Sequence, residues 1–427
     1  MKRTILLFAA TTAACISYAQ NQKVNIDIND VIRIEKTLSS DDMQGRKVFT
    51  PAIDKAARFI ASEFEKAGLQ KPEGGNGYLQ EFSVIRPRFI EAAATFDGQP
   101  VELKNLIVVT TSEAFSIDQA SGYEIVTIDP KTQLFSEAHK HIISGKNRLV
   151  LVDTSFAANF QRLTYFKRQM METGNSTVFV LGNKAPSTFT VTAKHEISKA
   201  PLSNVVGILP GRSKKDEYVI FSGHYDHLGI GKPLNGDSIY NGANDDAAGT
   251  TAVIMLAKYF SQLKDNERTI IFAAFTAEES GGYGSQYFSR QFDPAKVMAM
   301  FNIEMIGTES KWGKNSAYIT GFEKSDMGKI MEQNLKGTGF QFHPDPYPDQ
   351  QLFYRSDNAT LARLGVPAHT ISTSKMDSEK FYHTADDEFE TLDMTNMTEI
   401  IRAIALSSRS IVKGTDTPSR VNTSELR

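Results

Sequence analysis

Three stretches decide the fold: "EYVIFSG" (217–223), "DAAGTTAVIMLAKYFSQL" (246–263) and "RTIIFAAF" (268–275). The first and third are short, continuous apolar runs, which are typical of buried parallel strands, and the second has the length and apolar content of a helix. The same alternation continues along the chain from residue 203 to residue 412. This pattern predicts an α/β fold in which a mixed, mostly parallel sheet is covered by helices on both faces.

The chain before residue 203 has a different organisation. "PAIDKAARFIASEFEKAGL" (51–69) predicts an amphipathic helix that stops at Gly68, within an N-terminal part of the main domain over residues 20–85. Residues 86–200 predict an inserted β-rich or α/β subdomain, because short apolar runs alternate with polar loops: "NLIVVTT" (105–111), "YEIVTID" (123–129), "RLVLVDT" (148–154) and "STVFVLGN" (176–183). The main domain resumes over residues 201–413, and the polar tail, residues 414–427, is expected to fray.

The N-terminus, "MKRTILLFAATTAACISYAQ" (1–20), has the layout of a secretory signal. Two cationic residues precede an apolar core, and small residues stand two apart at Ser17 and Ala19. We therefore expect residues 1–19 to be a signal peptide and the protein to be exported, to the periplasm or the extracellular space. "TAAC" loosely resembles a lipobox, so a lipid anchor at Cys15 is the alternative. Plain secretion is favoured because Thr12, rather than leucine, stands three residues before Cys15.

Composition excludes several classes of function. The net charge of −3 shows no excess of positive charge of the kind that nucleic-acid-binding proteins have. No apolar run in the body approaches the roughly 18 residues of a membrane span. Cys15 is the only cysteine, so a chain cleaved after Ala19 would have neither disulfides nor a cysteine nucleophile.

Side chains that could bind a metal follow the predicted strands, which is where open α/β sheets form their sites. They are His224, Asp226, Asp245, Asp246, Glu278, Glu279, Glu304 and His383. Each has a structural explanation when taken alone: Asp245 and Asp246 would cap a helix, and adjacent glutamates usually lie in a solvated turn. Their joint occurrence at successive strand ends or at a helix start favours a metal site.

Mixed imidazole and carboxylate ligands suit zinc, and two metals about 3.5–4 Å apart can share one bridging carboxylate. The residues predict two zinc ions, with ligands divided as follows: His224 and Glu304 on one ion, Glu279 and His383 on the other, and Asp245 between them. Glu278 is then free to act as the general base on a metal-activated water. Asp226 shares a side of the extended chain with His224 and is expected to orient its imidazole.

Five motifs in order carry a resemblance to a known family: "GHYDH" (223–227), "NGANDDAAG" (241–249), "TAEESGGYGS" (276–285), "NIEMIG" (302–307) and "FYHTADD" (381–387). Over residues 28–413 the chain resembles the dizinc exopeptidases of metallopeptidase family 28, which include bacterial leucyl aminopeptidases, glutamate carboxypeptidase and glutaminyl cyclase. The resemblance implies a zinc-dependent exopeptidase (phosphorylase/hydrolase-like) fold and a peptide substrate. It implies the same ligands and the same general base. It places residues 86–200 where some members carry a protease-associated insert. It also places Tyr382 where some members have a tyrosine that stabilises a tetrahedral intermediate. Packing beside the site is an equally good explanation of Tyr382.

Four positions are less settled by the resemblance. The family more often has aspartate where this chain has Glu304, and histidine where it has Asn358. His227, the extra histidine of "HYDH", is expected to be a neighbour of the metals rather than a ligand. Arg355 could favour an acidic substrate, although a surface salt bridge is its more common use.

Three functions remain open. The first is a secreted zinc aminopeptidase that removes N-terminal residues from peptides. The second is a glutaminyl cyclase-like acyltransferase that uses one zinc ion, which the full ligand set disfavours. The third is a non-catalytic binding protein on the same fold, which the retention of both Glu278 and Glu279 disfavours.

Overall fold

The computed structural model describes residues 25–75, 77–234 and 236–426, so the expected signal peptide and Cys15 lie outside the described residues. Four parallel strands form the centre of the main sheet: β10 (Lys214–His224), β13 (Arg268–Phe275), β14 (Val297–Ile303) and β17 (Ala368–Ser372). Antiparallel strands extend the sheet on both sides, in the order β16-β15-β17-β14-β10-β13-β9-β1-β2. The predicted mixed α/β sheet is confirmed, and its central parallel part consists of these four strands.

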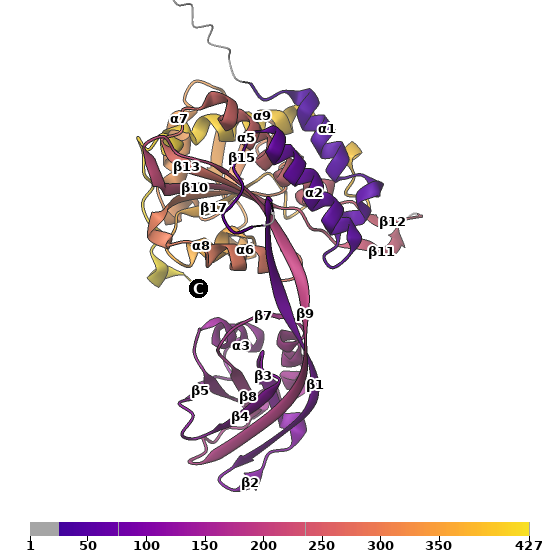
Figure 1. Ribbon diagram of the computed structural model, residues 1–427, viewed down its shortest axis with the longest axis vertical. Helices are drawn as coiled ribbons and strands as arrows, with labels where there is room; N and C mark the ends of the chain where they lie inside the picture. Colours follow the sequence, from indigo (N-terminus) through magenta and orange to yellow (C-terminus); the bar gives the residue numbers. More distant parts are fainter. Residues whose placement is uncertain (1–24, 76, 235, 427) are drawn as a thin grey trace, which may run out of the picture.

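Both faces of the central strands are buried, which explains their continuous apolar sequences. Phe221, Phe272 and Phe301 face one hydrophobic core, which they share with helices α1 (Ile28–Leu38), α2 (Pro51–Lys66), α5 (Ala248–Leu263) and α9 (Met394–Ser407). Their chain neighbours Ile220 and Ile271 face a second core on the opposite side, beneath α6 (Tyr283–Ser289) and α8 (Asn358–Ala362). Figure 1 shows these two helical layers above and below the sheet.

The remaining elements lie at the edges and in the connections. β15 (Ser316–Ile319) and β16 (Gln341–Pro344) complete one edge, beside α7 (Met327–Asn334). A separate hairpin consists of β11 (Gly229–Leu234) and β12 (Asp237–Tyr240). Shorter elements are β2 (Gln99–Pro100), β4 (Ala114–Asp118), β7 (Met170–Met171), α4 (Ala157–Phe160) and α10 (Arg409–Val412). No helix among the described residues is long and apolar enough to cross a membrane.

Two long antiparallel strands, β1 (Leu79–Phe96) and β9 (Phe189–Leu209), connect a smaller lobe to the main body (Figure 1). Between them in sequence lie α3 (Leu134–Ile143) and a four-stranded sheet of β3 (Leu106–Val109), β8 (Thr177–Leu181), β6 (Arg148–Val152) and β5 (Glu124–Ile128). These four strands are the apolar runs in the sequence of this region. The expected boundaries at residues 86 and 200 fall inside β1 and β9, so both strands belong to the lobe and to the main sheet.

The expectation that the C-terminal tail frays is wrong for its described residues. The Arg420 guanidinium donates to the Val297 carbonyl oxygen at 2.7 Å, and that of Arg268 donates to the Asp416 carbonyl oxygen at 2.7 Å. Val421 is only 4% exposed. A polar sequence packs here because one buried arginine of the main domain, Arg268, and main-chain carbonyl groups of that domain supply its hydrogen-bond partners.

Candidate metal centre and active site

Three adjacent strand ends bring the predicted ligands together. His224 is the last residue of β10 and lies opposite Phe275, the last residue of β13. Glu278 and Glu279 follow β13 within four residues, and Glu304 follows β14 directly. Because these strands are parallel neighbours, their carboxyl ends open into one place.

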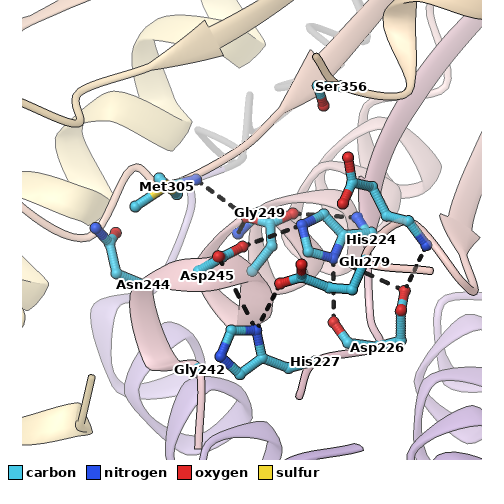
Figure 2. Close-up of polar contacts among 12 residues, drawn as sticks. His224, Asp226, His227, Gly242, Asn244, Asp245, Gly249, Glu279, Met305 and Ser356 are labelled. Carbon is cyan, nitrogen blue, oxygen red and sulfur yellow. Dashed lines mark hydrogen bonds and ion pairs between the residues drawn. The ribbon is translucent and has the colours of Figure 1, made fainter. Parts of the chain in front are cut away.

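The first group of candidate ligands consists of His224, Asp245 and Glu304. The His224 Nε2 atom lies 3.1 Å from Asp245 Oδ1, as Figure 2 shows. One nitrogen or oxygen atom from each of the three residues lies within 4.8 Å of the others. This spacing would allow all three atoms to contact one cation.

The second group shares Asp245 with the first. His383 Nε2 lies 3.2 Å from Asp245 Oδ2 and 3.1 Å from Glu279 Oε1. His227 also reaches this group, because its Nδ1 atom lies 3.0 Å from Glu279 Oε1 and 4.0 Å from Asp245 Oδ2 (Figure 2). His227 was expected to be a neighbour rather than a ligand; its ring is as close to Glu279 as that of His383, so its position would also allow it to be a ligand.

These groups fit a zinc site on the evidence of unsatisfied atoms. His224 Nε2, Glu279 Oε1, Glu304 Oε2 and His383 Nε2 are buried and have no hydrogen-bond partner among the residues that the structure describes. Buried polar atoms are normally hydrogen-bonded, so their convergence on one volume indicates a bound ion. Imidazole nitrogens and carboxylate oxygens are the donors that zinc takes alongside thiolates.

The electrostatics of the cluster also favour a cation. Burial tends to lower the pKa of His383, but contacts with Asp245 and Glu279 outweigh it and raise that pKa to about 10. Burial alone would raise the pKa of Asp245, whereas contacts with His224 and His383 lower it. The carboxylates thus retain protons on the imidazoles, and a metal that takes the same positions would displace those protons.

Glu278 stands beside the two groups without belonging to either. Desolvation raises the pKa of Glu278 well above its usual value, and the charges of Glu304 and Asp357 add to that rise. The Glu278 main-chain N–H donates to Asp226 Oδ1 at 3.0 Å. A carboxyl group held at the pocket with a raised pKa suits a proton carrier.

The orientation of His224 comes from a different atom than expected. His224 Nδ1 lies 3.1 Å from the main-chain carbonyl oxygen of Asp226, which accepts a hydrogen bond from the ring N–H and leaves Nε2 free for a metal. The Asp226 carboxylate is 3.8 Å from the ring, beyond hydrogen-bond distance. One oxygen of this carboxylate instead accepts the Glu278 main-chain N–H at 3.0 Å.

Asp246 ties two of the strand ends to helix α5. One carboxylate oxygen accepts the main-chain N–H of His224 at 3.1 Å, and the other accepts those of Gly249 and Met305 at 3.0 and 3.1 Å. A Cβ atom at Gly249 would clash with this carboxylate and with the Ile303 carbonyl oxygen. The glycine of "DDAAG" is therefore required for the close approach of the helix to the site.

Asp387 is a supporting residue that the sequence analysis missed. Its two carboxylate oxygens accept the main-chain N–H groups of Asn244 at 2.8 Å and Asp245 at 3.0 Å. Asp387 lies four residues after His383, so it links the loops that carry two candidate ligands. The sequence feature that could have identified Asp387 was the second aspartate of "FYHTADD".

The Asp387→Asn substitution is expected to weaken zinc binding about 10–100-fold, which is typical when a group that holds a ligand in place is lost. An amide has only one acceptor oxygen, so one of the two N–H groups would face another N–H donor. The measurement is zinc affinity by competition with a chromogenic chelator. Asp386→Asn, at the neighbouring residue, for which no side-chain hydrogen bond or ion pair is found in the described part of the chain, is the matched control; equal affinities in the two variants would contradict this role.

A pocket of about 110 Å³ opens onto the candidate ligands. Thr320, Thr370, Ser372 and Ser374 line it together with Arg355 and Tyr382. The Tyr382 ring stacks on the His383 ring, with centroids 3.9 Å apart, so it packs against a candidate ligand and borders the pocket at once. Arg355 has no carboxylate partner among the described residues, so the expected surface salt bridge is not formed there.

Two neighbours of Arg355 have separate roles. Asn358 lies behind the pocket: its amide group donates to the Phe353 and Ala368 carbonyl oxygens at 3.0 and 3.2 Å, fastening the loop to β17. Asp357 is buried, and neither of its carboxylate oxygens has a hydrogen-bond partner in the described part of the chain. Burial raises the pKa of Asp357 to about 6, and its charge acts on Glu278 and Glu304.

Part of the chain is similar in sequence to known aminopeptidases. The chain is 28% identical over 205 residues to a probable leucine aminopeptidase of Trichophyton verrucosum, covering 46% of this chain and 54% of the relative. It is 26% identical over 231 residues to leucine aminopeptidase 1 of Neurospora crassa, covering 50% of this chain and 54% of that protein. The chain thus spans about half the length of these curated relatives.

Solved structures share the fold. A zinc aminopeptidase from Bacillus subtilis superimposes with a TM-score of 0.56 at 16% identity, covering 94% of this chain and 99% of that one. An aminopeptidase from Aneurinibacillus sp. strain AM-1 gives a TM-score of 0.53 at 18% identity, covering 93% and 95%. The family model for peptidase family M28 matches residues 204–407, the segment that contains every candidate ligand described above. Residues 204–407 of the chain are therefore similar to peptidase family M28.

Proposed function

We propose that this protein is an aminopeptidase that uses two zinc ions to hydrolyse N-terminal residues from peptides. The observation that carries the proposal is the sharing of Asp245 between two groups of candidate ligands, with Glu278 beside both. The names of the M28 relatives, leucine aminopeptidases among them, point to the same activity. The proposal includes export of the protein after cleavage within residues 1–20, and this part rests on the sequence pattern alone.

The residues around the metal centre have separate roles in the proposed hydrolysis. When bound, zinc would lower the pKa of a water molecule and polarise the scissile carbonyl group. Glu278 takes the proton of the attacking water and returns it to the leaving amine. Tyr382 borders the pocket, and its hydroxyl group can donate a hydrogen bond to the oxygen of the tetrahedral intermediate. The carboxylates around the pocket favour the positive charge of a free α-amino group, which selects the N-terminus of a peptide.

The test is hydrolysis of a panel of aminoacyl-p-nitroanilides by the purified protein loaded with zinc. We expect turnover of free aminoacyl compounds and none of their N-acetylated counterparts, because an acetyl group removes the charge that the carboxylates recognise. Turnover should disappear with a chelator and return with added zinc. Preferential cleavage at free carboxyl termini of N-blocked dipeptides would refute the aminopeptidase assignment.

The same preparation tests the glutaminyl cyclase-like alternative. A peptide that begins with glutamine should lose that residue rather than cyclise with release of ammonia. Ammonia release without peptide cleavage would replace the aminopeptidase proposal with the transferase. A protein that binds zinc but converts neither substrate would instead support a binding role.

A further inference from the structure

A second cavity lies between the smaller lobe and the main body. Its volume is about 740 Å³, within the range of roughly 300–1,000 Å³ typical of ligand sites. The lobe contributes side chains from α3 and from residues 165–177, and the main body contributes residues 279–290 around α6. In Figure 1, α3 and β7 lie on the side of the lobe that faces α6.

This cavity adjoins the candidate active site. Glu279, a candidate zinc ligand, lines both the small pocket and the large cavity. Ser280 and Gly281 extend the wall from Glu279 toward α6. A peptide whose first residue is held at the metal centre would therefore have the large cavity next to it, on the other side of Glu279.

Apolar side chains on the lobe are left exposed on this wall. Ile143 is 51% exposed and Tyr165 is 58% exposed, although both are large apolar or aromatic residues. Phe166 and Met170 line the same side. Such a surface suits the side chains or the main chain of a bound peptide.

The two walls also carry positive charge, and the Arg168 guanidinium lies over the Tyr165 ring, 5.7 Å from its centroid. Arg168 comes from the lobe and Arg290 from the residue that follows α6, and neither has an ion-pair partner in the described part of the chain. The acidic residue Glu172, which also lines the cavity, is already paired with Lys199 at 3.1 Å. Guanidinium groups bind carboxylates with paired, charge-assisted hydrogen bonds.

We propose that this cavity binds the part of a peptide substrate that follows the cleaved bond, and that Arg168 and Arg290 select a carboxylate there. The preferred substrates are short peptides with negative charge downstream of the N-terminal residue. That carboxylate is supplied by an acidic side chain or by the C-terminus. The inference rests on the proposed aminopeptidase function and gives the smaller lobe a role in substrate choice.

The experiment uses the full-length zinc enzyme and a set of tetrapeptides that share the best N-terminal residue found with the anilides. One peptide has glutamate in its last two positions with a free C-terminus, one has glutamine there, and one of each is amidated. We expect kcat/KM to be about tenfold higher for the most acidic peptide than for the neutral amide, mainly through KM. In the double variant Arg168→Gln/Arg290→Gln this ratio should fall to near one.

Arg58→Gln is the matched control, because Arg58 is exposed on α2 and lines neither site. It should keep the wild-type ratio. If amidation alone abolishes the preference for acidic peptides, the arginines recognise the C-terminal carboxylate. If the change from glutamate to glutamine alone abolishes it, they recognise acidic side chains. Equal kcat/KM values for all four peptides, or an unchanged ratio in the double variant, would overturn the inference while aminoacyl-anilide hydrolysis still supports the proposed function. Absence of anilide and peptide hydrolysis would refute the proposed function itself.

Discussion

Replacing Glu278 with glutamine is expected to lower kcat by about 10²–10⁴-fold, the usual contribution of a general base, without lowering the zinc content. The amide has the same shape but cannot accept a proton from water. Glu278 belongs to neither group of candidate ligands, so its loss should leave the metal donors intact. Its main-chain hydrogen bond to Asp226, at 3.0 Å, does not involve the side chain and should persist in the variant.

The measurement combines steady-state kinetics on the best aminoacyl-p-nitroanilide with zinc analysis of the same dialysed sample. Glu279→Gln is the matched control, because it makes the same chemical change one residue away. Glu279 contacts His227 and His383 at 3.0 and 3.1 Å, so this variant should lose zinc as well as activity. Full turnover in the Glu278 variant would remove that residue from the mechanism, and zinc loss in it would make Glu278 a ligand.

The contrast between these neighbours shows what sequence could predict. Continuous apolar runs located the central strands, and metal-binding residue types at their ends located the site, because both patterns are local. The division of labour between Glu278 and Glu279 followed from counting donors. His227 was expected to be a neighbour of the metals rather than a ligand, and its distance to Glu279 could not be predicted because it depends on how the chain turns after β10, which no local pattern records.

The two long strands and the supporting residues were harder to predict. β9 alternates buried and exposed residues, with Phe189, Val191 and Ala193 inside, so it lacks the continuous apolar run that identified the central strands. Its partner β1 is interrupted by Pro87, which argues against a regular strand. Asp387 and Arg46 act on main-chain groups of distant segments, and a side chain that bonds a remote backbone leaves no periodicity in its own sequence.

Arg46→Met is expected to reduce the free energy of unfolding by about 3–5 kcal/mol, the scale found when one partner of a buried charged network is removed. Arg46 is fully buried, and its guanidinium donates to four main-chain carbonyl oxygens. These belong to Leu38 at 2.7 Å, Tyr225 at 2.8 Å, Asn241 at 2.6 Å and Gly242 at 2.9 Å. Methionine fills a similar volume and leaves those buried acceptors without donors.

The position of Arg46 makes a second consequence measurable. Tyr225 lies between His224 and Asp226, and Gly242 lies three residues before Asp245, so one guanidinium fastens the two loops that carry candidate ligands. A Cβ atom at Gly45 would clash with the Tyr240 carbonyl oxygen, which shows how closely the Arg46 segment approaches the second loop. We therefore expect weaker zinc binding in Arg46→Met even under conditions where the variant remains fully folded.

Urea unfolding followed by circular dichroism measures the stability, and chelator competition at low temperature measures zinc affinity of the folded variant. Arg58→Met is the matched control, because the Arg58 side chain is exposed, and its effect should stay within about 0.5 kcal/mol. Arg46→Lys should recover part of the loss, since an ammonium group can donate to some of the four carbonyls. If Arg46→Met loses stability but binds zinc with wild-type affinity when folded, Arg46 supports the fold without positioning the metal loops. Wild-type stability would show that the carbonyl groups find other donors.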